Sequence, residues 1–277
     1  MAEPQAGDGP RSDTRGIVDA RELFARVRFR RREAAPPLRP YLEHYWLIDW
    51  DLAEPYASHV VPHPCVNVVF QRYGDEAPWG EVAGVGRELF TKKLEGRGRV
   101  CGVQFRPGGF RPFAPQWPVS QWTGRRVPVD DVLTDADADA VVAPDEEDAR
   151  VAALDAFLLG LRPAADPQAE RATALVERVR RDRTIRRVGQ LAALEDVSAR
   201  TLQRLFAAYV GVGPKWVVLR YRVHEALERA EAEGRPGSEP DWATLAAELG
   251  YSDQAHLVRD FTATVGVPPT AYRAQQR

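Results

Sequence analysis

Arginine, glutamine and threonine side chains gather on two short segments of this chain, in patterns that suit contact with DNA. Arginine can bind guanine O6 and N7 with two hydrogen bonds, and glutamine can bind adenine N6 and N7 in the same manner. The side chains concerned are Arg200, Thr201, Gln203 and Arg204 in the first segment, and Gln254, His256 and Arg259 in the second. The chemistry that these residue types offer is the reading of base edges.

The elements that must position these side chains are two amphipathic helices. In the first, Ser198 is a good N-cap, Gly211 ends the helix, and apolar residues recur at helical spacing between them. Those apolar residues are Leu202, Leu205, Phe206 and Tyr209. In the second, Ser252 or Asp253 is the N-cap, and the inward-facing residues are Leu257, Phe261 and Val265. A short helix and a tight turn precede each segment, which is the order of a helix-turn-helix unit.

The two units are copies of one another. The stretches QLAALEDVSARTLQRLFAAYVGVGP and TLAAELGYSDQAHLVRDFTATVGVPP share a serine at the turn, an L-x-R-x-F pattern and a closing VGVxP. Between them the pattern predicts a longer helix that begins near Pro214 and ends at Gly234. Before the first unit lies a cluster of arginines, some of which we expect to contact phosphates. These are Arg178, Arg180, Arg181, Arg183, Arg186 and Arg187.

The stretch YSDQAHLVRDFTATVGVPPTAYR resembles the signature of AraC-type transcriptional regulators, and the resemblance covers residues 173–277. It implies an all-α domain of two helix-turn-helix units whose recognition helices enter successive major-groove segments of double-stranded DNA. The implied base-reading residues are Arg200, Thr201, Gln203, Arg204, Gln254, Ala255, His256 and Arg259, and the implied phosphate contacts are Ser198 and Ser252. Alanine at position 255 lacks the polar group often present there. The family also implies RNA polymerase as a partner, a homodimer and no cofactor.

The N-terminal part has a different sequence pattern, in which short apolar runs alternate with Gly and Pro. The spacing of runs such as YLEHYWLIDWDL and RVCGVQFRPGG predicts a β-sandwich or barrel. The motifs PLRPYLEHYWLID, VVPHPCVNVVF and FRPGGFRPF resemble the N-terminal domain of a bacterial subgroup of the same regulators, although His63-Pro64 stands where Asp-Gly is expected. This resemblance implies a β-rich, cupin-like domain for effector binding or dimerisation. The predicted fold class of the whole chain is α+β and multidomain.

Aromatic and histidine side chains in this part allow two interpretations. They could form a β-core with an amphipathic rim, or they could line a pocket for a small apolar or planar effector. The candidate pocket residues are Trp46, Trp50, His59 and His63. His59, His63 and Cys65 also have a metal-ligand spacing, H-x3-H-x-C. The two prolines that interrupt this run disfavour the regular strand that would align the three ligands, so we expect no metal.

Charge is distributed unevenly along the 277 residues. The chain holds 38 basic and 40 acidic side chains, and the net charge of −2 excludes a uniformly basic surface. Residues 1–129 and 171–277 each carry +4, whereas residues 130–170 carry −10. These shifts predict four parts: a disordered tail (1–15), a β-rich domain (16–130), an acidic, partly helical linker (131–170) and the double helix-turn-helix domain (171–277).

One segment of the acidic linker has a clear helical period. Within Arg150–Leu161, apolar residues at helical spacing form a single stripe, and acidic residues precede it, where they suit a helix N-terminus. Two interpretations stay open for this helix. It could be a solvated linker helix, or it could pack on a neighbouring domain or on a second subunit.

Motifs for catalysis are missing from the sequence, which has no G-x-S-x-G, P-loop, G-x-G-x-x-G or H-E-x-x-H pattern. We expect a DNA-binding regulator without catalytic activity, modulated through its N-terminal domain by a small-molecule effector or by dimerisation. The alternative is a methyl-acceptor enzyme that responds to DNA alkylation, for which only Cys65 and Cys101 are available. No apolar run is long enough for a membrane span and no signal-peptide core is present, so we expect a cytoplasmic protein without a membrane partner.

Overall fold

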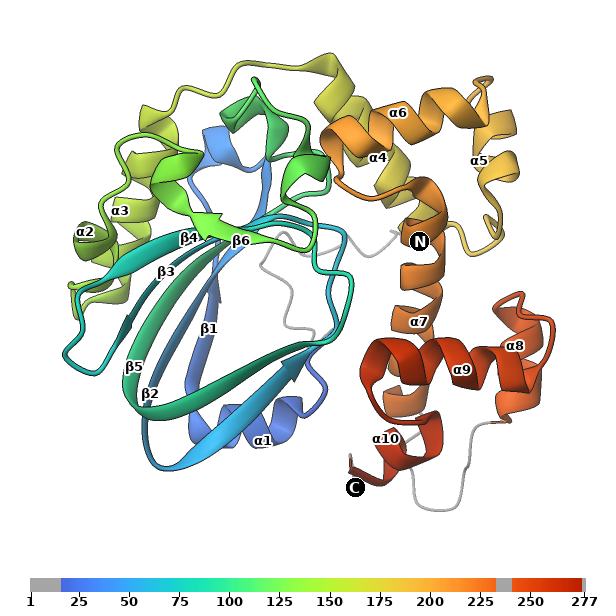
Figure 1. The fold of residues 1–277 in the computed structure, drawn as a ribbon, viewed down its shortest axis with the longest axis horizontal. Helices are drawn as coiled ribbons and strands as arrows, with labels where there is room; N and C mark the ends of the chain where they lie inside the picture. The colour runs from blue at the N-terminus through green and yellow to red at the C-terminus, as the bar shows by residue number, and fades with distance from the viewer. Residues whose placement is uncertain (1–15, 233–240, 276–277) are drawn as a thin grey trace, which may run out of the picture.

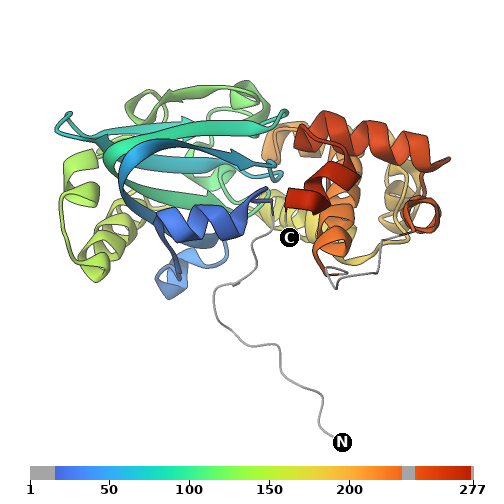
Figure 2. The ribbon, with the colours of Figure 1, turned by 90° about the horizontal axis from the view of Figure 1, so that it is seen from below.

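The computed structural model describes residues 16–232 and 241–275, and the expected tail 1–15 lies outside them. A β-rich lobe and a helical lobe lie side by side (Figures 1 and 2). The predicted α+β class, with a β-rich N-terminal region and a helical C-terminal region, is confirmed. Within the described residues no helix is both long and apolar enough to cross a membrane.

A six-stranded antiparallel sheet forms the β-rich lobe. Its strands are β1 (Arg28–Arg32), β2 (Leu42–Val60), β3 (Asn67–Tyr73), β4 (Trp79–Ala83), β5 (Phe90–Phe105) and β6 (Arg126–Pro128). The order across the sheet is β1-β2-β5-β3-β4-β6, so that β1 and β6 are its edges. The long strands β2 and β5 pair along most of their length and curve across the lobe (Figure 1). The sheet therefore has a convex and a concave face.

Successive side chains of β2 point to opposite faces of the sheet, as strand geometry requires. Tyr45 and Leu47 belong to the core that α2 (Ala138–Val142) and α3 (Glu147–Gly160) cover. Trp50 belongs to a second apolar cluster on the other face, together with residues of α1 (Ala20–Arg26). Four short 3-10 helices complete the lobe: η1 (Pro36–Leu38), η2 (Arg111–Phe113), η3 (Val119–Trp122) and η4 (Val129–Asp131).

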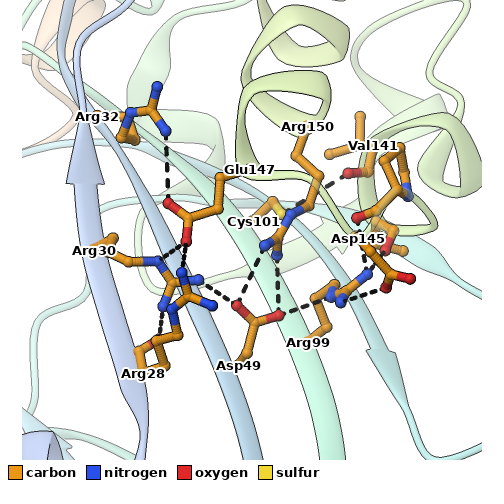
Figure 3. A network of polar contacts seen from close by, with 12 residues as sticks. Arg28, Arg30, Arg32, Asp49, Arg99, Cys101, Val141, Asp145, Glu147 and Arg150 are labelled. Atoms are coloured by element: carbon orange, nitrogen blue, oxygen red, sulfur yellow. Dashed lines mark hydrogen bonds and ion pairs between the residues drawn. The ribbon is translucent and has the colours of Figure 1, made fainter.

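The acidic segment that was expected to be a linker is part of the β-rich lobe. Val142 of α2 and Leu154 and Leu158 of α3 are fully buried in the same core as the sheet residues. Charge pairing helps to hold it there, because Arg150 of α3 is 1% exposed and donates to Asp49 of β2 at 3.0 Å (Figure 3). Of the two interpretations of this helix, packing against a domain is therefore the one that the structure shows.

Helices alone form the C-terminal lobe. They are α4 (Pro167–Arg181), α5 (Val188–Leu194), α6 (Ala199–Tyr209), α7 (Pro214–Ala232), α8 (Trp242–Glu248), α9 (Gln254–Val265) and α10 (Pro269–Gln275). The long helix α7 connects the α5–α6 pair to the α8–α9 pair (Figure 1). Its place agrees with the longer helix predicted to begin near Pro214.

The two lobes share apolar packing. Val85, in the loop between β4 and β5, is fully buried in a cluster with residues of α4, α6 and α7. Val61, in the loop after β2, is buried with residues of α7, α8 and α9. In the same loop His63 stacks on His224 of α7, with 4.1 Å between ring centroids. The helical lobe is therefore docked against the sheet through several loops.

Candidate functional site

The first helix-turn-helix unit consists of α5 and α6. Leu202 and Phe206 of α6 are buried in the core of the helical lobe. On the opposite side of α6 the predicted base-reading side chains are all exposed: Arg200, Thr201, Gln203 and Arg204. The hydroxyl of Ser198 accepts a hydrogen bond from the Thr201 amide at 3.1 Å, so Ser198 is the N-cap, as predicted from the sequence.

The second unit, α8 and α9, presents its side chains in the same manner. Leu257, Phe261 and Val265 of α9 are buried. Gln254, Ala255 and Arg259 are exposed, and His256 is half-buried. Of the two N-cap candidates in the sequence, the structure selects Asp253, whose carboxylate accepts from the His256 amide at 2.7 Å.

The turns of the two units have matching backbone geometry, in agreement with the duplicated sequence. Asp196 and Gly250 occupy matching places and both have positive φ, +48° and +75°. In each turn the residue after the one with positive φ donates its amide back to the first helix, Val197 to the Ala192 carbonyl at 3.0 Å and Tyr251 to the Ala246 carbonyl at 2.9 Å. Glycine and aspartate are residues that tolerate this left-handed conformation. The two recognition helices therefore leave equivalent turns.

Ser252, a predicted phosphate contact, lies beside a predicted base reader. Its hydroxyl is 3.1 Å from Nδ1 of His256, and the His256 ring packs edge-on against Tyr251 with centroids 5.0 Å apart. These two contacts fix the orientation of the imidazole at the start of α9. Ser252 is also exposed, so its hydroxyl lies at the helix N-terminus where a phosphate could bind.

Most of the arginine cluster before the first unit is engaged within the protein. Arg178 pairs with Glu195 at 3.5 Å, and Arg183 pairs with Glu225 at 2.8 Å. Arg180 and Arg181 both pair with Glu177, at 2.8 and 2.6 Å. By contrast, among the described residues no acidic side chain forms an ion pair with Arg200, Arg204 or Arg259. Arg200, Arg204 and Arg259 of α6 and α9 are thus exposed and have no ion pair within the part of the chain that the structure describes.

Two arginines that the sequence did not single out for this purpose join the two units. Arg186, before α5, donates to the Glu248 carbonyl at the end of α8 and packs against Gly250. Arg222 of α7 in turn donates to the Arg186 carbonyl and lies 5.6 Å above the Tyr251 ring. These contacts link the start of the first unit to the turn of the second. They were not visible in the sequence because the residues are far apart along the chain.

A cavity of about 520 Å³ lies on the concave face of the sheet. Three of the predicted pocket residues line it, namely Trp46, Trp50 and His63. His59 is not among the lining residues, and its Nδ1 is 2.9 Å from the Thr91 hydroxyl on the exposed surface. The position of His59 follows from strand alternation, because its neighbours Ser58 and Val60 are the residues that line the cavity.

The three residues with metal-ligand spacing are not brought together around one point. His63 stacks on His224, His59 contacts Thr91, and Cys65 is buried beside the Asn67 amide at 3.7 Å. Within the described part of the chain no group of three or more His, Cys, Asp or Glu side chains could hold a metal ion.

Both cysteines are buried, which bears on the methyl-acceptor alternative. Burial raises the pKa of the Cys65 thiol to about 12 and that of the Cys101 thiol to about 11. Methyl transfer to cysteine needs the thiolate, and these pKa values disfavour it at neutral pH. The structure therefore offers no activated cysteine in the described residues.

Comparison with known proteins gives two family matches. Residues 191–275 match a family model described as a helix-turn-helix domain, and residues 30–128 match one described as a domain of unknown function, DUF6597. No curated protein matches this chain. Among solved structures, ToxT from Vibrio cholerae is similar at 9% identity, over 83% of this chain and 97% of ToxT, with a TM-score of 0.40. An unsaturated fatty acid bound form of ToxT from Vibrio cholerae matches at 10% identity, over 83% and 94%, with a TM-score of 0.41.

Proposed function

Because residues 191–275 form a helix-turn-helix domain of the AraC type, we propose that this chain is a transcriptional regulator that binds a specific sequence of double-stranded DNA. The observation that carries the proposal is the pair of equivalent turns, each followed by a capped helix with exposed polar residues. Two such helices on one long connecting helix predict an asymmetric site of roughly 20 base pairs, about two turns of DNA.

In this proposal the exposed side chains of α6 and α9 read the bases. Arg204 and Arg259 each occupy the same place in the L-x-R-x-F pattern, and both are exposed. Each would bind a guanine with two hydrogen bonds, and Gln203 or Gln254 would bind an adenine. Ser198 and Ser252 would contact phosphates at the two helix starts. RNA polymerase contact and a homodimer belong to the same proposal.

In this proposal the β-rich lobe regulates DNA binding by the helical lobe. Its cavity of about 520 Å³ is large enough for a small effector, and its lining is mainly apolar with a few polar side chains. Residues Pro62 and His63 line this cavity and also contact His224 of α7. An effector that binds two arrangements of this loop with different affinity would shift the position of the helix that joins the DNA-reading units.

The test is a DNA-binding titration of the full chain and of Arg204→Ala and Arg259→Ala. The probe is the DNA upstream of the chain's own gene, with a scrambled duplex of equal length as control. Each substitution should weaken specific binding by about 1–3 kcal/mol and relax selectivity at one base pair. Equal losses on specific and scrambled DNA would reduce both arginines to phosphate contacts, and equal binding of the two duplexes by the unaltered chain would overturn sequence specificity.

A further inference from the structure

The two helix-turn-helix units are joined in two ways, by α7 along the chain (Figure 1) and by a side chain that crosses from one unit to the other. We propose that this side chain, Arg186, fixes the spacing that the chain requires between the two half-sites of its DNA. The inference rests on the proposed function, because it assigns the residue that sets the length of the proposed site. Arg186 acts through the position of the second unit and does not touch the bases, which makes it a positioning residue.

The apolar cores of the two units are separate. Val218 of α7 is buried with residues of α4, α5 and α6, whereas Leu227 of α7 is buried with residues of α8 and α9. Within the described residues the two clusters have no member in common, and the β-rich lobe enters them through different loops, at Val85 and Val61. Apolar packing therefore connects the units only through other elements, and Arg186 adds a direct contact between them.

The backbone of Arg186 is tied to the first unit. The Oε1 atom of Gln190, in α5, accepts hydrogen bonds from the amides of Arg186 at 2.8 Å and Arg187 at 2.9 Å. The Nε2 atom of the same side chain donates to the Thr184 carbonyl at 3.1 Å. One glutamine thus binds the segment before α5 to that helix, and the position of Arg186 follows the position of the first unit.

The side chain of Arg186 reaches the second unit. Its guanidinium donates a hydrogen bond to the carbonyl of Glu248, the last residue of α8. Carbonyls at the end of a helix have no partner within the helix, and the helix dipole favours a cation there. The stem of the side chain packs on Gly250, where an added Cβ would overlap it. Arg186 therefore contacts both the end of α8 and the turn that leads to α9.

Arg222 of α7 reinforces this contact. Its guanidinium donates to the Arg186 carbonyl and lies 5.6 Å from the centroid of the Tyr251 ring, a distance at which a cation is attracted to the ring face. Tyr251 is buried in the turn of the second unit, and Arg222 is half-buried beside it. The connecting helix, the start of the first unit and the turn of the second unit therefore meet at one joint.

Such a joint resists the movement that a changed spacing demands. Because DNA completes a turn in about 10.5 base pairs and about 34 Å, one inserted base pair moves the second half-site by about 3 Å and rotates it by about 34°. To follow, α9 would have to move by the same amount relative to α6. The hydrogen bonds of the joint would break, since a hydrogen bond tolerates changes of only about 0.5 Å.

Arg186 can be replaced without opening a core, because its side chain is exposed. Exposed substitutions usually change stability little, so Arg186→Met should fold. The matched control is Arg187→Met, which removes an equal charge from the neighbouring exposed position. Gly250→Asn is a second, independent variant. Asparagine accepts the φ of +75° at this turn, and its Cβ would displace Arg186.

The joint itself is tested without DNA, by pulsed electron paramagnetic resonance on the full chain. Spin labels are attached at Gln203→Cys and Ala263→Cys, which are exposed positions on α6 and α9, while both native cysteines are buried. The distance distribution should be narrow in the unaltered background and in Arg187→Met. It should be about twofold wider in Arg186→Met and in Gly250→Asn, because the units can then turn about α7. Equally narrow distributions in both of these variants would overturn the joint.

The role in spacing is tested on DNA that the full chain selects from a random duplex library. One base pair is then inserted or removed between the half-sites. This change should weaken binding by the unaltered chain and by Arg187→Met about a hundredfold, because one unit loses its base contacts. For Arg186→Met the loss should be about tenfold or less. An equally large loss in Arg186→Met would overturn the role in spacing, and uniformly weaker binding at every spacing would make Arg186 a phosphate contact instead.

The two measurements separate this inference from the DNA-binding proposal. If Arg186→Met widens the distance distribution but the unaltered chain selects no DNA sequence, the regulator and the role in spacing are overturned and the joint stands. If the chain selects a sequence but Arg186→Met keeps its narrow distances and its spacing, only the inference about Arg186 is overturned.

Discussion

Asp49 on β2 binds three arginines between the sheet and α3, where Glu147 of α3 is a second carboxylate partner of Arg30. Asp49 accepts hydrogen bonds from Arg30 at 2.5 Å, from Arg99 at 2.7 Å and from the buried Arg150 at 3.0 Å (Figure 3). Burial by itself would raise the pKa of Asp49, but hydrogen bonds from Arg150, Arg99 and Arg30 outweigh it and hold the pKa below its usual value. Asp49 therefore stays ionised in the folded protein.

The lowered pKa of Asp49 sets the sign of an acid dependence. A carboxylate with a depressed folded-state pKa stabilises the fold above its unfolded-state pKa, and this contribution is lost as the pH falls through the folded-state value. Asp49→Asn should therefore lower the free energy of unfolding at pH 7 by about 3 kcal/mol, because it leaves Arg150 buried without its carboxylate. Urea denaturation should show a smaller difference between the two proteins in acid, below about pH 4.

The double substitution Asp49→Leu with Arg150→Met is the control for this prediction. Replacing both partners removes the buried charge of Arg150 with its counter-charge, and Arg30 and Arg99 keep Glu147 and Asp145 as partners, so the loss should be smaller than in Asp49→Asn. A double variant as unstable as Asp49→Asn would mean that shape, and not charge pairing, holds α3 on the sheet.

At the level of elements, the start of α6 combines two roles that a pair of substitutions can separate. Ser198 caps the helix through its hydroxyl and is exposed at the N-terminus, where the proposal places a phosphate. Ser198→Ala should cost about 1 kcal/mol of stability, because the cap is lost. Ser198→Asp should keep the cap and the stability but weaken DNA binding, because its charge repels the phosphate.

The measurements are thermal unfolding and DNA titration of both Ser198 variants. If Ser198→Asp binds DNA as tightly as the unaltered chain, no phosphate lies at this helix start. If Ser198→Ala is as stable as the unaltered chain, the cap contributes nothing, and the hydrogen bond to Thr201 is incidental.

Elements whose signals are local could be predicted from the sequence. The helices α6 and α9, their apolar stripes and the cap at Ser198 follow from spacing alone, and the structure confirms them. For the helix of the acidic segment the sequence left two interpretations open, because its apolar stripe was visible but its partner was not; the structure packs it on the sheet. Arg150 and Asp49 are 101 residues apart in the chain, and no local sequence pattern predicts such a pair.

The cavity, too, could be predicted from the sequence only in part. The aromatic residues could be picked out, but the pairing of Trp46 with Gly102 depends on the register between β2 and β5. That register also places His59 on the outside, whereas His63 follows the end of β2, in a loop that lines the cavity. Base-reading roles for α6 and α9 stay predictions, because exposure shows which side chains are available and not what they bind.

At the scale of the whole molecule, the net charge is near zero, but negative and positive charge lie in different parts of the chain. Residues 130–170 carry −10, of which residues 130–160 carry −9, and the helices of this segment, α2 and α3, lie on the side of the sheet away from the helical lobe (Figure 1). Residues 171–277 carry only +4, and several of their arginines pair internally. Affinity for DNA should therefore depend on a few exposed side chains of α6 and α9 more than on bulk charge.

The lobes should unfold together, because apolar side chains cross the boundary between them. Val85 comes from the loop between β4 and β5 but is fully buried in the cluster of α4, α6 and α7. Val85→Ala should lower the free energy of unfolding by about 2 kcal/mol, from lost burial and the void that remains. The matched control is Val68→Ala, which empties an equally buried position inside the β-rich lobe. Calorimetry should show one unfolding transition for the unaltered chain and one for Val68→Ala, the latter at a lower temperature. Val85→Ala should show two separate transitions, one for each lobe. A single transition in Val85→Ala would show that the lobes are coupled through their other contacts, such as the buried Val61 and the His63–His224 stack, and two transitions in the unaltered chain would show that the lobes are not coupled.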